Sequence, residues 1–127
     1  MAHGFLQSFD RNIEVQSAGT FPGTEVNTRA IQVMSEVGID ISHHYPKPVD
    51  IYLNYEWDFV ISVCDQANES CPVFTGRVKH RLHYSYIDPS FLPGSEEFIM
   101  GEFRKLRDNM KDAFYELYLQ KIKPELK

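Results

Sequence analysis

The segment from Asp58 to Val63 constrains the fold more than any other part of the chain, because its apolar residues are nearly continuous. Such a run between polar segments is typical of a strand buried on both faces of a parallel sheet. A second, weaker strand is predicted from about Val78 to Tyr84. The alternation from Ile13 to Ser17 predicts a further strand, which stops at Ala18-Gly19-Thr20.

Helical patterns alternate with these strands. Residues 1–9 resemble the end of a helix, Asn27 is expected to cap a helix that stops at Gly38, and a short helix is possible within 49–55. Ser95 is expected to cap a long final helix, and the charged residues at 104–108 are interpreted as its solvated face. The apolar stripe of that helix consists of Phe103, Leu106, Met110, Phe114 and Leu117. This alternation predicts a three-layer α/β fold, a parallel sheet with helices on both faces.

Composition indicates one globular domain over residues 1–127, large enough to bury a core. Hydrophobic residues make up 43% and charged residues 24%, which excludes a disordered chain. The net charge of -5 disfavours nucleic acid or an anionic membrane surface as a partner. No apolar stretch approaches the ~20 residues of a membrane span, and we expect no signal peptide in the first residues. We expect a cytoplasmic protein, since two cysteines favour a reducing compartment.

Cys64 and Cys71 are the only cysteines, and they bracket a polar segment directly after the apolar run. In a regular helix this spacing separates two residues by about 10 Å along the axis, whereas a disulfide needs Cα atoms within roughly 7 Å. A bridge therefore requires the segment to rearrange, which favours a reversible redox pair. The alternative is two small buried thiols that never meet. Because zinc needs three or four ligands at short spacings, which neither the cysteines nor the histidines supply, we predict no metal and no cofactor.

Three polar positions follow the ends of the predicted strands. In parallel sheets of this class the site lies at the carboxyl ends of the strands. Cys64 follows one such end, Ser17 lies at another, and Asp88 comes just beyond a third. A carboxylate at position 88 is a candidate general acid, and the simpler interpretation is an Asp-Pro turn with Pro89.

A collinear resemblance extends over essentially the whole chain. It is carried by the segments Ser17–Thr20, Gly23–Asn27 with Ala30, Met34–Ser42, Asp58–Cys64, Cys71–Pro72, Asp88–Pro89 and Phe103–Asp108. Together they resemble the thioredoxin-coupled arsenate reductases of the low-molecular-weight tyrosine phosphatase fold. The Cys64/Cys71 spacing is the most specific element, because simple phosphatases of this fold lack the pair.

The resemblance implies a cascade of three cysteines. The first lies in a phosphate-binding Cys-x5-Arg loop, where its thiolate attacks arsenate. The position matching Cys64 attacks the arsenic-bound cysteine and releases arsenite. The position matching Cys71 resolves that disulfide and leaves a Cys64–Cys71 bridge, which a thioredoxin-like reductant opens. Asp88 matches the general acid, and Ser17 and Asn27 are expected to be structural residues near the site.

The Cys-x5-Arg loop of the family pattern has no convincing counterpart in this sequence. In the family the phosphate loop directly precedes the residues that Met1–Leu6 resemble, so we expect the first strand, the nucleophilic cysteine and the loop arginine to be missing. The formal match Cys71–Arg77 carries Pro72 and Phe74, where a phosphate cradle needs small residues and free N–H groups. Residues that bind the oxyanion, arsenate or phosphate, therefore stay unassigned. No potassium ion is expected, because the acidic positions that hold this ion in some relatives are His3 and Lys47 in this sequence.

Three interpretations remain open. The chain is a truncated arsenate reductase, a non-catalytic binding module, or a thiol-redox module that uses only Cys64 and Cys71. The missing strand is central in the family's sheet, so its loss has a structural consequence. Either the strand at Ile13–Ser17 closes onto the strand at Asp58–Val63, or unpaired edges are exposed. Exposed edges predict a homodimer or an exchange of strands.

Overall fold

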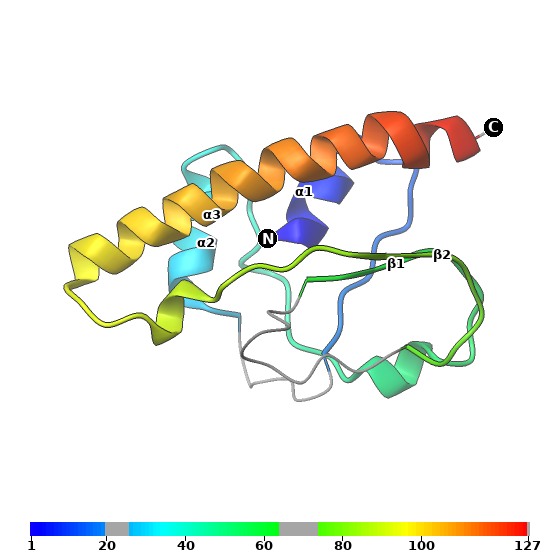
Figure 1. The fold of residues 1–127 in the computed structure, drawn as a ribbon, viewed down its shortest axis with the longest axis horizontal. Coiled ribbons are helices and arrows are strands. Elements are labelled where there is room, and N and C mark those ends of the chain that lie inside the picture. Colours follow the sequence, from blue (N-terminus) through cyan, green and yellow to red (C-terminus); the bar gives the residue numbers. More distant parts are fainter. Residues whose placement is uncertain (20–25, 64–73, 127) are drawn as a thin grey trace.

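The computed structural model describes residues 1–19, 26–63 and 74–126. The helices are α1 (Ala2–Phe9), α2 (Thr28–Ser35) and α3 (Glu96–Leu117), and the strands are β1 (Trp57–Ser62) and β2 (Val78–His83). Short helical turns are η1 (Val49–Tyr52), η2 (Pro89–Phe91), η3 (Tyr118–Ile122) and η4 (Lys123–Glu125). In Figure 1, α1 and α3 lie above the paired strands and η1 lies below them. None of the helices in these ranges is both long enough and apolar enough to cross a membrane.

The two strands are parallel neighbours, with Phe59 opposite His80 and Ile61 opposite Leu82. The predicted α/β class with a parallel sheet is therefore confirmed. The predicted strand at Ile13–Ser17 is wrong, because within the described ranges the sheet contains only β1 and β2. It therefore does not close onto β1. From Ile13 to Gln16 the side chains alternate between half-buried and exposed, so the sequence pattern reflects burial on one side without strand pairing.

An isolated parallel bridge follows that segment and joins Gly19 to Pro48. The Gly19 N–H donates to the Lys47 carbonyl at 2.9 Å, and the Val49 N–H donates to the Gly19 carbonyl at 3.0 Å. This bridge ties the extended segment before it to the connector that leads into η1.

β1 is less buried than its sequence predicts. Its side chains are half-buried, except that of Asp58, which is exposed. The prediction of burial on both faces is wrong because the fully buried residues gather between the helices, and β1 has one paired neighbour in the described part of the chain.

The core forms where α3 packs against α1 and α2. Phe5 of α1, Val33 of α2 and Phe114 of α3 are completely buried. Four residues of the predicted stripe on α3 are buried, and Leu106 is half-buried against them. α1 and α2 have eight residues each, and helices this short are marginal in water without tertiary packing. They are therefore stable only because α3 covers their apolar faces.

Local capping sets the helix ends as predicted. The Asn27 side chain accepts the Arg29 N–H at 2.8 Å, and the Ser95 hydroxyl accepts the Phe98 N–H at 3.1 Å. After α2, the Gly38 N–H donates to the Ser35 carbonyl and the Ile39 N–H donates to the Met34 carbonyl, both at 3.0 Å. This pair of bonds is a Schellman motif, which needs a left-handed residue. Gly38 supplies it with a φ of 80°.

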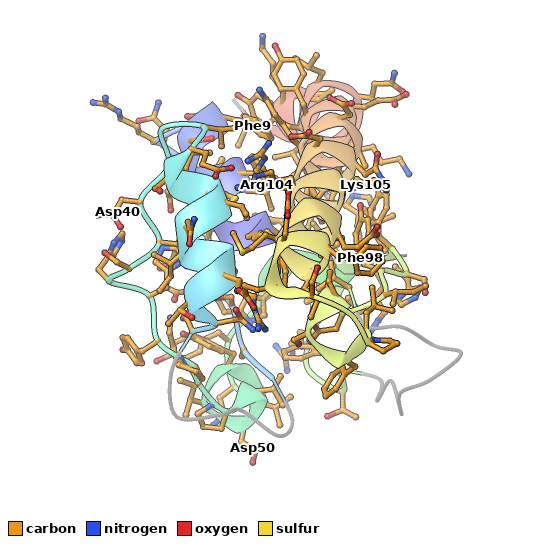
Figure 2. All side chains as sticks on the ribbon, turned by 90° about the vertical axis from the view of Figure 1, so that its left-hand side faces the viewer. Phe9, Asp40, Asp50, Phe98, Arg104 and Lys105 are labelled. Carbon is orange, nitrogen blue, oxygen red and sulfur yellow. The ribbon has the colours of Figure 1, made fainter. Side chains whose placement is uncertain are left out.

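Ion pairs join α3 to the helix beside it. Arg104 and Arg107 of α3 bond to Glu36, at the end of α2, at 2.9 and 2.8 Å. At the other end Arg29 and Glu96 form a bidentate pair at 2.9 and 2.7 Å. Arg104 lies between the two helices in Figure 2. The prediction of a merely solvated charged face is therefore wrong for Arg104 and Arg107.

Exchanging glycine for alanine at Gly38 and at Gly101 should shift stability in opposite directions. No atom lies within 4 Å of an added Cβ at either position. Gly38→Ala forces an L-residue into the left-handed region and should cost roughly 1–2 kcal/mol. Gly101→Ala, inside α3, should stabilise by roughly 0.5–1 kcal/mol. Urea unfolding of both variants measures this, and a neutral or stabilising Gly38→Ala would contradict the assignment of the motif.

Candidate active site

The carboxyl ends of the two strands lie side by side. Ser62 ends β1 and is in register with His83, which ends β2. The Ser62 hydroxyl lies 2.7 Å from Nδ1 of His83, and the Tyr84 N–H donates to the Ser62 carbonyl at 2.8 Å. The chain therefore leaves β1 and β2 at the same edge of the sheet. Cys64 follows Ser62 by two positions, and both Cys64 and Cys71 lie outside the described residues.

Asp88 lies in the connection that leaves this edge after β2, and it caps η2. Its Oδ1 accepts the Ser90 N–H at 2.9 Å and also accepts the Ser90 hydroxyl. The residue is exposed, as are the apolar side chains of Ile87 and Phe91 beside it. The turn that the simpler interpretation expects is present. It uses one carboxylate oxygen for capping, and no hydrogen bond to Oδ2 comes from the residues that the structure describes.

Ser17 and Asn27 lie in separate local arrangements. The Ser17 hydroxyl lies 2.8 Å from Nδ1 of His3 in α1. Asn27 caps α2 and lines a polar hollow with Arg29, Gln32 and Glu96. The bidentate pair with Glu96 uses Nε and Nη2 of Arg29 and places a carboxylate charge against the guanidinium in this hollow. Among the described residues no hydrogen bond joins Ser17, Asn27 and Asp88 to one another.

The contact between Ser62 and His83 was not anticipated from the sequence. A signal was present, because both residues end the predicted parallel strands and such ends meet at one edge. No set of three or more His, Cys, Asp or Glu side chains in ranges 1–19, 26–63 and 74–126 is arranged to hold a metal ion.

His3 titrates abnormally in this environment. Burial first, and then repulsion from His44 and Lys47, lowers the pKa of His3 from 6.5 to about 4. The rings of His3 and His44 are stacked with centroids 4.3 Å apart. His3 is therefore neutral near pH 7, and its Nδ1 can accept a hydrogen bond from the Ser17 hydroxyl.

Comparisons with known proteins give a consistent set of similarities. The family described as low molecular weight phosphotyrosine protein phosphatase matches residues 5–127. Arsenate reductase 2 of Staphylococcus epidermidis is 38% identical over 88 residues, 69% of this chain and 62% of that protein. The arsenate reductase of Shouchella clausii is 35% identical over 111 residues, 87% of this chain and 78% of that protein. A solved arsenate reductase in the reduced state has a TM-score of 0.68 and 28% identity, and the match covers 91% of this chain and 83% of that one.

The low pKa of His3 predicts a loss of stability in acid. Between pH 6.5 and about 4 the unfolded chain binds more protons at this imidazole than the folded chain does. Its contribution is therefore fully present above pH 6.5 and is lost as the pH falls toward 4. His3→Asn keeps a polar partner for Ser17 and should make this loss shallower. Urea unfolding across the window measures the slope, and equal slopes for the two proteins would contradict the prediction.

Proposed function

The chain belongs to the low molecular weight phosphotyrosine protein phosphatase family, and we propose that within this family it takes part in the reduction of arsenate to arsenite. The observation that carries this proposal is the similarity to proteins named arsenate reductase, at 35–38% identity. The Staphylococcus epidermidis match spans 62% of the relative's length. Because this match covers less than two thirds of the relative, the activity named for that protein is carried over to this chain only as a proposal.

The proposed chemistry passes two electrons through thiols. A nucleophilic thiolate attacks arsenate, and the oxygen that leaves takes a proton from Asp88. The Cys64 thiolate then attacks the sulfur of the arsenic-bound cysteine, so that the S–As bond breaks and its electrons leave with arsenite. The Cys71 thiolate attacks Cys64 in turn, expels the first thiolate and forms a Cys64–Cys71 disulfide. A thioredoxin-like reductant of the cytoplasm returns that disulfide to two thiols.

The arrangement of the sheet edge supports these roles. Cys64 follows the end of β1, and Asp88 lies in the connection that follows β2, so both segments leave neighbouring strands at one edge. Asp88 is exposed and keeps one carboxylate oxygen out of the η2 cap. A general acid needs this access, because its proton must reach the leaving oxygen.

The proposed cascade needs a third thiol. The chain has two cysteines, and both already have a role in the cascade. The formal Cys-x5-Arg match from Cys71 to Arg77 contains Pro72 and Phe74, which remove an N–H and crowd a phosphate cradle. We therefore propose that the 127 residues supply the two exchanging thiols and the acid, and depend on a further cysteine for the attack on arsenate.

The purified chain alone should not reduce arsenate, because an activated thiolate beside an anion cradle is required and neither cysteine has one in the sequence. Thioredoxin-coupled oxidation of a nicotinamide cofactor measures the turnover. An added N-terminal segment with a Cys-x5-Arg loop should restore it, and the same segment with serine in place of that cysteine is the matched control. Turnover by the 127 residues that is lost in Cys64→Ser would refute the proposal.

The restored protein also tests Asp88. Asp88→Asn keeps an oxygen that can cap η2 but has no acidic proton, so the fold should be retained. Turnover should fall by about 10²–10⁴-fold, the usual contribution of a general acid. Unchanged turnover would remove Asp88 from the mechanism.

Cys64 and Cys71 should form an intramolecular disulfide under mild oxidation and lose it to reduced thioredoxin. They lie in a polar segment with few apolar residues, so local unwinding should cost less than global unfolding. Peptide mapping by mass spectrometry of the oxidised monomer measures the pairing. If both thiols stay free in a folded protein, or pair only between chains, the chain has no thiol-exchange role and the binding-module interpretation takes its place.

A further inference from the structure

Three basic side chains and one hydroxyl from three segments meet beside α1, and we call this group the His3 cluster. It consists of His3 from α1, Ser17 from the extended segment, and His44 with Lys47 from the connector before η1. His3 bonds to Ser17 at 2.8 Å and stacks on His44, with an angle of 28° between the rings. Lys47 bonds through Nζ to the side-chain oxygen of Gln16 at 3.2 Å, next to Ser17.

Packing holds these segments together. A Cβ at Gly4 would lie 2.8 Å from Cγ2 of Ile41, so α1 approaches the connector as closely as a glycine permits. Ile41 is 1% exposed and belongs to the core. The Gly19–Lys47 backbone bond ties the third segment to the same connector. Packing of the core therefore brings His3 and His44 together, although their surroundings disfavour a positive charge on either imidazole.

The surroundings of the cluster disfavour a positive charge on either imidazole. His3 is repelled by His44, Lys47, the α-amino group of Met1 and His43, after the larger effect of burial on its pKa. Burial and repulsion also lower the pKa of His44, and Asp40 alone opposes them. Asp40 itself is engaged by the Ser42 N–H at 2.8 Å. In the described part of the chain no carboxylate lies within ion-pair distance of Lys47.

We propose that the His3 cluster binds a small inorganic oxyanion of the phosphate or sulfate class. Lys47 supplies a fixed positive charge and uses one of its three N–H donors on Gln16. The second ring nitrogen of His3 and the ring of His44 supply further donors, and both rings are near enough to Lys47 to be repelled by its charge. An anion at this position would offset the repulsion that arises when these imidazoles take up protons beside Lys47. The site uses neither cysteine and does not depend on the proposed thiol chemistry.

Binding should be coupled to the uptake of protons. The bare imidazole of His3 is neutral at pH 7, and an anion favours its charged form. Affinity for sulfate, which stays a dianion over this range, should therefore increase as the pH falls below 7. The titratable groups that face the ring are those of His43, His44, Lys47 and the Met1 amino group, and Asp40 faces His44.

NMR of the imidazole signals tests the site in a Cys64→Ser/Cys71→Ser variant, so that thiol chemistry plays no part. Inorganic phosphate and sulfate are added at constant ionic strength, with chloride as the balancing salt. The His3 and His44 signals should move saturably and their protonation midpoints should rise by about one pH unit, the effect of one nearby opposite charge. The signal of His83 should not move.

Matched variants separate a built site from general electrostatic attraction. Lys47→Gln should weaken binding by about tenfold or more, the usual cost of losing a charged hydrogen-bond donor. Lys105→Gln removes the same charge from a lysine paired with Glu102 on α3 and should bind normally. His44→Asn provides a second test if Lys47→Gln does not fold. Equal binding by both lysine variants, or signals at His3 and His44 that move no more than that of His83, would overturn the proposal.

Discussion

The contact of α3 with α1 and α2 is the interaction on which the rest of the structure depends. The two eight-residue helices cannot persist alone, and their buried residues Phe5 and Val33 meet Phe114 of α3 in one core. Arg107 reinforces this contact with a side chain only 11% exposed, which bonds to the Val33 carbonyl and to Glu36. A charged side chain that is so little exposed to solvent needs its partners, because a buried unpaired charge would destabilise the fold. The hydrogen bonds from Arg104 and Arg107 accordingly lower the pKa of the Glu36 carboxyl.

Local signals in the sequence predict local structure well. The caps at Asn27 and Ser95, the stop at Gly38 and the stripe of α3 depend on residues within a few positions of each other. The segment from Ile13 to Ser17 shows where such reasoning stops. Its alternation is real, but strand pairing depends on what lies beside it in space. The Arg104–Glu36 pair spans 68 positions and is likewise invisible to a local pattern.

The candidate site also combines features that local sequence predicts with contacts between distant segments. Asp88 follows the predicted strand and caps a turn that begins at Pro89. Its position and its capping role can both be predicted because they depend on residues adjacent in the sequence. The partners of Ser17 and His83 come from distant segments, and only the folded chain brings them together. The His3 cluster is the clearest case, since helix, extended segment and connector each contribute to it and none of the three has a recognisable motif. The assignments of Cys64 and Cys71 derive from the family resemblance and from their spacing.

We propose that Cys64 and Cys71 act in sequence, the first as the attacking thiol and the second as the resolving one. Reaction with one equivalent of an aromatic disulfide, followed by mass spectrometry, tests this order directly. Cys71→Ser should retain an aromatic adduct on Cys64. The unaltered chain should lose that adduct, release two aromatic thiolates for each disulfide consumed, and end with a Cys64–Cys71 bridge. A stable adduct on Cys64 of the unaltered chain, with Cys71 still free, would contradict the account.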